Sequence, residues 1–146
     1  MVGNWDPEEE QILLLDQLLK KLSENTNVLF LYAIRYGRVT QTLLECEKRC
    51  SHLVEIGDKE ESDFLASTFL LNTWTGGNDH DIEDQYRWSY SNVTITFTAW
   101  NTGEPSVGYP AQAEEKDCID LLRNGKWNDR PCSYLNSFIC EMPYGL

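Results

Sequence analysis

Hydrophobic residues recur at helical spacing near the N-terminus and in two later segments of the chain. Isoleucine and leucine occupy positions 12, 15, 19 and 22, and leucines at 14 and 18 widen the same stripe. The preceding residues DPEE at 6–9 are typical of a helix start, because aspartate caps a first turn and proline fits the first helical position. These patterns predict a helix over residues 6–22, with two further helices over 41–49 and 57–71.

The remaining apolar positions predict strands. The run VLFLYAIRYGRV at 28–39 is rich in aliphatic and aromatic residues and indicates a buried strand or a hairpin around Gly37. From residue 73 onward the helical period disappears, and tryptophan, glycine, asparagine, threonine and aspartate become frequent. Short strands are expected at 52–56, 85–90, 94–99, 117–122, 125–128 and 137–141. Helices first and an irregular antiparallel region afterwards make an α+β domain.

An excess of acidic residues limits the partners that this chain can have. The sequence has 146 residues, with 12 basic against 24 acidic side chains and a net charge of −12. This balance repels nucleic acids and anionic membrane surfaces and favours cations, although a solvated acidic surface explains the charge equally well. No segment reaches the length of a membrane span, about 18 consecutive apolar residues, so we expect no membrane insertion.

The cysteines indicate the cellular compartment. There are five: Cys46, Cys50, Cys118, Cys132 and Cys140. No histidine cluster or second closely spaced cysteine pair accompanies the first two, which argues against a zinc site. A disulfide framework formed in an oxidising compartment fits better and leaves one odd thiol. The glycosylation sequon NVT at 92–94 agrees with a secreted, extracellular protein.

The C-terminal half carries several short motifs in a specific order. CIDL at 118–121, GKWND at 125–129 and FICE at 138–141 contain or flank three cysteines that are 14 and 8 residues apart. Upstream stand WTGGND at 74–79, YRW at 86–88 and WNTGEP at 100–105. From about residue 28 to residue 142 this succession resembles the C-type lectin-like domain family.

The resemblance implies the fold of that family: two helices, small antiparallel sheets and a long loop region, here with an extra N-terminal helix. It divides the chain into a Leu-rich segment, 1–27, and a lectin-like domain, 28–146. The helix over 6–22 either packs on its own domain or forms a neck that pairs with the same helix of another subunit.

The resemblance also implies a disulfide pairing, Cys46 with Cys140 and Cys118 with Cys132. A Cys50–Cys140 bond is the alternative to the first. If the first pairing holds, Cys50 is either a buried free thiol or a link to another subunit.

A calcium site built from two loops is a further implication. In the family, the positions of Glu104, Ser106, Asn128 and Asp129 hold Ca²⁺, and the peptide bond before Pro105 is cis. Two carboxylates, an amide carbonyl and a hydroxyl are oxygen ligands of the kind that Ca²⁺ takes. In lectin members, two neighbouring sugar hydroxyls complete the calcium shell and hydrogen-bond the same carboxylates and amides. Metal and sugar then share one site.

Two residues depart from the family pattern at this site. Ser106 stands where asparagine is common, and a hydroxyl is a poorer calcium ligand than an amide carbonyl. Lys116 stands two residues before Cys118, where a ligand glutamate is usual. Glu114 or Glu115 could supply the missing carboxylate.

An auxiliary calcium site, found in some family members, falls on Asp79, Glu83 and Asp117. Val107 occupies another ligand position of that site, so the set is incomplete. Solvated acids therefore explain these three residues better than a bound ion.

The choice of sugar depends on the order of donors and acceptors. Glu104 can only accept hydrogen bonds and Ser106 can donate or accept, so the motif matches neither the mannose-type Glu-Pro-Asn nor the galactose-type Gln-Pro-Asp of the family. Tyr109 and Trp127 are nearby aromatic residues, and an aromatic face can stack on the apolar patch of galactose. The expectation leans toward galactose-type sugars, with mannose-type sugars as the alternative.

The resemblance thus implies a secreted, calcium-dependent lectin that recognises glycans on microbial or host surfaces. A homo-oligomer linked by the N-terminal helix or by Cys50 would strengthen binding through avidity. The alternative is a calcium-independent lectin-like domain that contacts a protein, a mineral or ice. No Ser-His-Asp, Cys-His or zinc arrangement has the spacing of a catalytic site, so we do not expect an enzyme.

Overall fold

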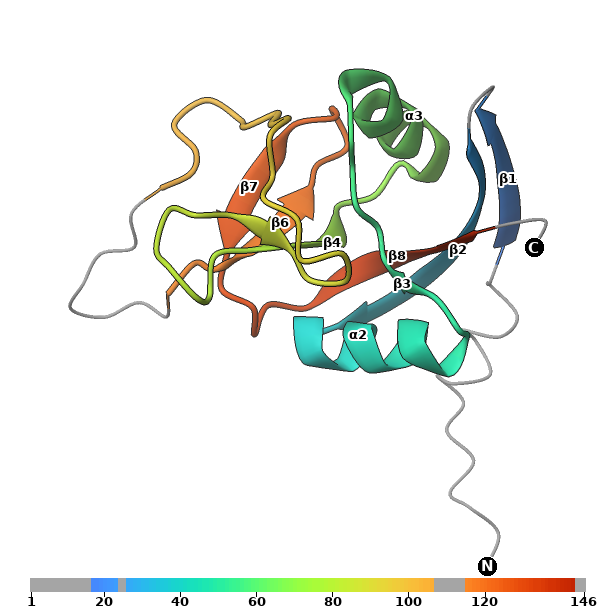
Figure 1. The fold of residues 1–146 in the computed structure, drawn as a ribbon, viewed down its shortest axis with the longest axis horizontal. Coiled ribbons are helices and arrows are strands. Elements are labelled where there is room, and N and C mark those ends of the chain that lie inside the picture. Colours follow the sequence, from blue (N-terminus) through green and yellow to red (C-terminus); the bar gives the residue numbers. More distant parts are fainter. Residues whose placement is uncertain (1–16, 24–25, 107–114, 144–146) are drawn as a thin grey trace, which may run out of the picture.

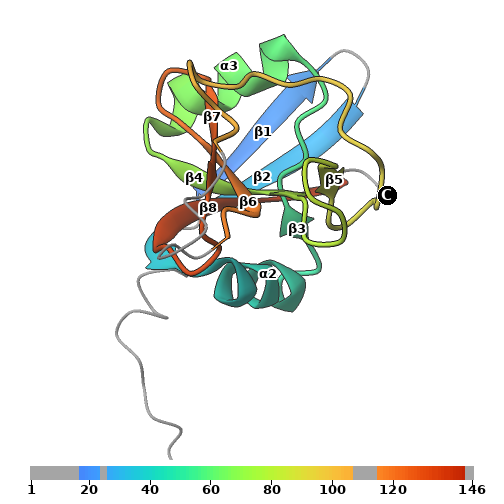
Figure 2. The ribbon, with the colours of Figure 1, turned by 90° about the vertical axis from the view of Figure 1, so that its left-hand side faces the viewer.

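Two helices lie on opposite sides of one sheet (Figures 1 and 2). The computed structural model describes residues 17–23, 26–106 and 115–143. The helices are α2 (Val39–Lys48) and α3 (Lys59–Phe69), close to the two segments where the sequence predicts them. α3 begins where the carboxylate of Asp58 accepts a hydrogen bond from the backbone N–H of Glu61 at 2.8 Å, which satisfies an otherwise unpaired donor of the first turn. Neither helix has both the length and the apolar composition that crossing a bilayer requires.

Eight strands form the sheet within the described residues. Their bounds are β1 (Gln17–Ser23), β2 (Thr26–Gly37), β3 (His52–Leu53), β4 (Thr73–Asn78), β5 (Arg87–Trp88), β6 (Cys118–Leu121), β7 (Trp127–Arg130) and β8 (Asn136–Pro143). The strand order is β1-β2-β8-β4-β6-β7, with β3 paired to β8 and β5 paired to β4. Neighbours are antiparallel except β4 and β8, which are parallel.

The predicted α+β fold, with two helices and a strand region, is confirmed, and its strands join in one mixed sheet because β8 pairs with β4 in the parallel direction. Two expectations need correction. The segment 94–99 makes an isolated bridge at Thr94 in place of a strand. The predicted N-terminal helix is wrong over residues 17–22, which belong to β1, whereas residues 1–16 lie outside the described residues. Continuous pairing with β2 supplies hydrogen-bond partners for the β1 backbone, and such tertiary pairing overrides the helical spacing of the leucines.

Two clusters of buried side chains join the helices to the sheet. The cluster that includes residues of α3 contains Leu65, Ile119 and Trp127, and the cluster that includes residues of α2 contains Trp74. Trp127 is fully buried, and its Nε1 donates a hydrogen bond to Ser62 Oγ at 3.0 Å. β7 is therefore anchored at its first residue, directly before the Asn-Asp pair of the candidate site.

The disulfides are those that the resemblance implies. Cys46 is bonded to Cys140, with a Cα–Cα distance of 5.5 Å, and links α2 to β8. Cys118 is bonded to Cys132, with a Cα–Cα distance of 5.2 Å, and links β6 to the segment that follows β7. Cys50 is a free thiol and is exposed, which corrects the option that it is buried.

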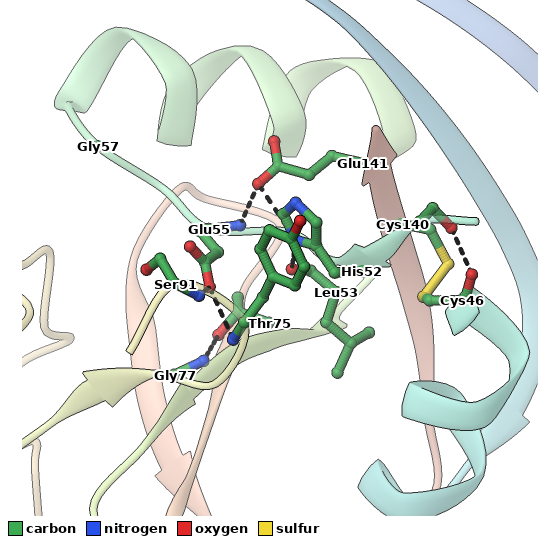
Figure 3. A network of polar contacts seen from close by, with 12 residues as sticks. Cys46, His52, Leu53, Glu55, Gly57, Thr75, Gly77, Ser91, Cys140 and Glu141 are labelled. Carbon is green, nitrogen blue, oxygen red and sulfur yellow. Dashed lines mark hydrogen bonds and ion pairs between the residues drawn. A yellow bond between two sulfur atoms is a disulfide. The ribbon is translucent and has the colours of Figure 1, made fainter. Parts of the chain in front are cut away.

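A polar network, here called the Glu55 network, fastens a surface loop to β3 and β8 (Figure 3). Glu55 Oε2 accepts hydrogen bonds from the backbone N–H groups of Tyr90 and Ser91, both at 3.1 Å. Glu141 Oε1 accepts from the backbone N–H of Glu55 at 2.8 Å and lies 3.8 Å from Nδ1 of His52. The ring of His52 stacks on Tyr90 with a centroid distance of 3.9 Å. Each of the two carboxylates therefore has protein donors as partners.

Candidate metal centre

Backbone hydrogen bonds hold the segment 99–106 against β7. The N–H of Trp127 donates to the carbonyl of Ala99, and the N–H of Asn101 donates to the carbonyl of Trp127, both at 2.8 Å. Side chains two residues apart on a strand point to the same face, so Asp129 lies on the face that Trp127 buries. Asp129 is only 4% exposed. The order of residues in β7 thus brings a carboxylate under the loop that contains the Glu-Pro-Ser motif.

Three of the four predicted calcium ligands come together there. The backbone N–H of Ser106 donates to both carboxylate oxygens of Asp129, at 3.0 and 3.1 Å. The Oγ of Ser106 lies 3.4 Å from Asp129 Oδ1, and the carboxyl groups of Glu104 and Asp129 hydrogen-bond each other. The peptide bond between Glu104 and Pro105 is cis, as the resemblance implies.

The two carboxyl groups of this site have pKa values that shift in opposite directions. Burial, followed by the hydrogen bond with Glu104, raises the pKa of Asp129 to about 7. Burial also acts to raise the pKa of Glu104, but hydrogen bonds with Asp129 and Ser106 and the positive charge of Lys116 bring it below its ordinary value. Oε2 of Glu104 is buried and has no hydrogen-bond partner among the described residues. Two adjacent acids with oppositely shifted pKa values, one of them with a buried oxygen that lacks a hydrogen-bond partner among the described residues, form a site to which a cation is attracted.

Lys116 extends toward the same group of oxygens. Its Nζ donates a hydrogen bond to Oγ of Ser106 at 2.6 Å. The sequence identified Lys116 as a lost carboxylate ligand, whereas the structure adds that its ammonium contacts an expected ligand directly. A divalent ion bound by Ser106 has to displace this contact.

Asn128 does not join the other three residues. The orientation that satisfies both halves of its amide has the oxygen accepting from Nη2 of Arg130 at 3.0 Å and the nitrogen donating to the carbonyl of Trp127 at 3.3 Å. The Nε of Arg130 also donates to Oδ2 of the fully buried Asp120 at 2.7 Å. Arg130 was not identified from the sequence, although its place two residues after Asn128 in a strand puts both side chains on one face.

Of the two aromatic residues that the sequence offered as sugar contacts, the structure describes only Trp127. Trp127 is 0% exposed and packs in the core, so the prediction that it contacts sugar is wrong. Tyr109 lies outside the described residues. Trp100, which is partly buried beside Trp127, is a nearer aromatic candidate because it leads directly into the Glu-Pro-Ser loop.

The auxiliary acids form a compact cluster. Carboxylate oxygens of Asp79, Glu83 and Asp117 all lie within 4.8 Å of one another. Asp79 is 3% exposed; its Oδ2 accepts from the N–H of Asp84 at 2.9 Å, and its Oδ1 is buried with no partner among the described residues. Burial and the charges of Glu83 and Asp117 raise the pKa of Asp79 to about 6. Oδ2 of Asp117 is 3.1 Å from Nδ1 of His80. The structure favours a cation here more than the sequence does.

The donor set of the main site suits Ca²⁺. The oxygens of Glu104, Ser106 and Asp129 are hard ligands, and the buried unpartnered Oε2 of Glu104 is the atom that a cation would satisfy. Ca²⁺ needs six to eight oxygens, so ligands beyond these three side chains, such as sugar hydroxyls, have to complete its shell.

The chain matches the family model of the lectin C-type domain over residues 38–142. It is similar to the carbohydrate-recognition domain of the mouse scavenger receptor C-type lectin, with 25% identity, a TM-score of 0.76, and coverage of 86% of this chain and 95% of that one. It is also similar to the C-type carbohydrate-recognition domain of cow CD23, solved in the presence of a GlcNAc2Man3 oligosaccharide, with 26% identity and a TM-score of 0.73 over 88% of this chain and 100% of that one. The herring type II antifreeze protein matches with 25% identity and a TM-score of 0.68 over 83% and 94% of the two chains.

Proposed function

The chain belongs to the lectin C-type domain family, and from this premise we propose that it is a calcium-dependent carbohydrate-binding domain. One observation carries the proposal. The Glu-Pro-Ser loop meets Asp129 through the N–H of Ser106, burial and the hydrogen bond with Glu104 raise the pKa of Asp129 to about 7, and one buried oxygen of Glu104 has no partner among the described residues. One proton neutralises only one of two converging carboxylates, whereas a divalent cation can neutralise both.

Sugar binding at the same place follows from the chemistry of the ligands. Glu104, Ser106 and Asp129 would hold Ca²⁺, and because the ion takes six to eight oxygens, two neighbouring hydroxyls of a sugar ring could supply further ligands. The ionised carboxylates then accept hydrogen bonds from those hydroxyls, and bonds to charged acceptors are stronger than neutral ones. The preference for galactose-type over mannose-type sugars rests on Tyr109 and stays a proposal, because Trp127 does not reach the surface.

The auxiliary cluster is proposed as a second, weaker calcium site. Its three carboxylates converge, and Oδ1 of Asp79 is buried without a partner in the part of the chain that the structure describes. Two sites of unequal affinity would fill in sequence as calcium rises, and the millimolar calcium outside cells suits weak sites of this type. Secretion of the chain, which two disulfides support, is part of this proposal.

Oligomerisation is proposed through Cys50. The thiol is exposed at the end of α2, so it is accessible to the same thiol of a second chain. Because one sugar makes a small contact, linking two domains would raise the affinity for a surface that displays many glycans. Whether residues 1–16 contribute to a neck also belongs to this proposal.

A second candidate function has one specific observation in its favour. The ammonium of Lys116 already binds Ser106, and Asn128 is engaged by Arg130, so the site is partly satisfied without a metal. A calcium-independent domain that contacts a protein, a mineral or ice would need no further change. The similarity to a herring antifreeze protein shows that the same fold occurs outside sugar binding.

A calcium titration separates the two candidates. The full chain is titrated with Ca²⁺ by calorimetry and by thermal unfolding, with Mg²⁺ as the control ion, and is then applied to galactose and mannose resins. The proposal expects a rise of the melting temperature with Ca²⁺, retention on one resin and elution by a chelator. An unchanged melting temperature in millimolar Ca²⁺, or retention that survives the chelator, supports the calcium-independent candidate.

A further inference from the structure

The sequon NVT at 92–94 is a motif that the proposed function leaves unused, apart from its agreement with secretion. Asn92, Val93 and Thr94 are all exposed at the surface. Within the described residues, the side-chain amide of Asn92 makes no hydrogen bond, and only the backbone of this residue is engaged. The amide is therefore accessible and unengaged, which is what an enzyme that modifies it requires.

Hydrogen bonds fix the backbone of the sequon in a turn that follows β5. The N–H of Asn92 donates to the carbonyl of Trp88 at 2.9 Å, and the N–H of Trp88 donates to the carbonyl of Val93 at 3.0 Å. The carbonyl of Asn92 accepts from Nη1 of Arg87 at 2.9 Å. The φ of Asn92 is 58°, in the left-handed region that asparagine adopts more readily than most other residues. Both backbone polar groups of Asn92 are thus satisfied, and its side chain is the group left free.

An exposed aromatic ring stands two residues before Asn92 in the same turn. Tyr90 is 69% exposed, a high value for a residue with so much apolar surface. Its ring stacks on His52, with centroids 3.9 Å apart and planes 5° from parallel, and its N–H donates to Oε2 of Glu55 at 3.1 Å. The stack covers one face of the ring. The ring is therefore held in place while its other face is open to solvent.

A sugar attached to Asn92 begins within reach of this open face. Positions two residues apart along a chain are separated by at most about 7 Å. One face of a sugar ring consists of C–H groups, which can pack on an aromatic face as other apolar groups do. Because His52 and Glu55 already order Tyr90, this contact costs little conformational entropy. The sugar would also shield apolar surface at Val93, which is 57% exposed.

We propose that Asn92 carries an N-linked glycan and that the first sugar of this glycan packs against the free face of Tyr90. The proposal rests on the secretion that forms part of the proposed function, because this modification is made in the secretory pathway. It is independent of the calcium site. The glycan then has a structural role, since it stabilises the turn that the Glu55 network fastens to the sheet.

The donor in this reaction is a lipid-linked oligosaccharide diphosphate. The amide nitrogen of Asn92 forms a bond to the anomeric carbon of the first sugar. The bond from that carbon to the diphosphate oxygen breaks with its electron pair, and the proton lost by the amide neutralises the diphosphate that leaves. Thr94 supplies the hydroxyl that the sequon requires two residues after the asparagine.

Two substitutions of Thr94 provide a matched pair for the site of modification. Thr94→Val removes the hydroxyl and keeps the shape of the side chain, whereas Thr94→Ser keeps the hydroxyl. Thr94 is exposed and pairs with Arg87 through its backbone, so neither change disturbs the core. The full chain is expressed in animal cells behind a cleavable secretory signal. Intact mass is measured in medium and lysate, with and without a peptide N-glycosidase. We expect a glycan on the unaltered chain and on Thr94→Ser, and none on Thr94→Val.

The packing on Tyr90 is tested by thermal unfolding. An endoglycosidase trims the glycan to its first sugar, and the product is compared with the same chain made without a glycan in bacteria and oxidised to the same disulfides. We expect the single sugar to raise the melting temperature by about 2–4 °C, the shift for a contact as strong as an aromatic pair in a chain of this length. Tyr90→Leu should lose most of this rise. Tyr36→Leu, which alters an aromatic residue of similar exposure outside this turn, should keep it.

The outcomes separate this proposal from the proposed function. A chain without a glycan in medium and lysate, or a glycan that persists on Thr94→Val, overturns the assignment to Asn92. A rise in melting temperature that is equal in Tyr90→Leu overturns the packing on Tyr90. Each variant is compared with its own sugar-free form, so any loss of stability from the substitution itself cancels. The calcium titration is repeated on the same samples: a glycosylated chain that does not respond to Ca²⁺ supports the glycan and contradicts the metal centre.

Discussion

Two pairs of acidic side chains in this protein have opposite surroundings. In the Glu55 network, backbone N–H groups approach each carboxylate, and the imidazole of His52 lies beside Glu141. In the candidate metal centre, the carboxyl group of Glu104 interacts with that of Asp129, and their pKa values shift in opposite directions. Every carboxylate of the first pair has protein donors, whereas in the second pair Asp129 accepts from the N–H of Ser106 but also meets Glu104, whose buried Oε2 has no hydrogen-bond partner among the described residues.

The difference separates a structural role from a binding role. A carboxylate whose oxygens have protein donors holds its loop in place whether or not a ligand is present. A carboxylate that is left with a buried, unpartnered oxygen is held in an unfavourable environment, and a cation can relieve it. Acidic residues are abundant on this chain. Whether each carboxylate oxygen has a hydrogen-bond donor from the protein is therefore a better guide to function than the number of carboxylates.

The largest expected effect comes from Glu104→Gln, which keeps the shape of the side chain and removes one charge. Without calcium, the amide can donate to Asp129, so the melting temperature should stay equal or rise. With calcium at about 100 times the dissociation constant, the unaltered protein should gain about 2.7 kcal/mol of unfolding free energy, and the variant should lose most of this gain. Thermal unfolding with calcium and with a chelator measures both.

The matched control is Glu55→Gln in the Glu55 network. It removes the same charge from a carboxylate that accepts from Tyr90 and Ser91. It should leave the calcium-dependent gain intact. A Glu104→Gln protein that keeps the full gain would assign calcium to the auxiliary cluster instead.

Glu141→Ala should cost about 1–3 kcal/mol of unfolding free energy, the usual penalty for a donor that loses its buried partner. The change removes the acceptor of the Glu55 N–H, and the Glu141 side chain is 11% exposed. Because this network is independent of metal, the loss should be equal with calcium and with a chelator. Urea unfolding of this variant and of the milder Glu141→Gln under both conditions provides the measurement, and a loss that appears in one condition alone contradicts it.

The sequence was informative where structure is local. Helical spacing predicted α2 and α3, and the ordered motifs indicated the family and hence its disulfides. β1 was missed because leucines at 18, 19 and 22 also satisfy a helical stripe, and only contact with β2 decides between the two. The parallel pairing of β4 with β8 joins segments far apart in the chain, which no local pattern encodes.

The candidate site was predictable in its residues but not in its contacts. The motifs located Glu104, Ser106 and Asp129, yet the position of the Lys116 ammonium on Ser106 depends on the path of the chain between them. The amide of Asn128 is bound by Arg130, a contact that follows from strand alternation once β7 is known. The sequence does not predict which charged side chains from other segments contact the site.

Calcium affinity should depend on pH at the metal centre. The pKa of Asp129 in the folded, calcium-free protein is about 7, above its ordinary value of 3.8. Calcium has to displace the proton of Asp129, so below pH 7 the dissociation constant should rise by about tenfold per pH unit, with one proton released per ion. Calorimetry in buffers of different ionisation enthalpy counts the proton, and an affinity that is constant between pH 5.5 and 8 contradicts the raised pKa of Asp129.

The same shift predicts how stability responds to pH. Without calcium, the folded state holds the proton of Asp129 more tightly than the unfolded chain does, so this group favours folding at low pH. That contribution declines as the pH rises from about 4 to about 7, and the lowered pKa of Glu104 offsets part of it. With saturating calcium the trend should reverse, because the ionised pair then binds the metal.

The substitution Lys116→Met has the smallest expected effect on calcium affinity. It tests whether a donor from the protein weakens calcium binding at the metal centre, which would make the centre more like the Glu55 network. Lys116 donates a hydrogen bond to Ser106, so one expected metal ligand already has a partner within the protein. Removing one positive charge should tighten calcium binding by about 1 kcal/mol, roughly fivefold, the size of the repulsion between a unit charge and a divalent ion across about 8 Å in water-like surroundings. Lys59→Met, an equal change on α3 beside Asp63, should have no effect. If Lys116→Met weakens calcium binding, the lysine orders the loop for the metal instead of competing with it, and the contrast between the two acidic pairs then depends on Glu104 and Asp129 alone.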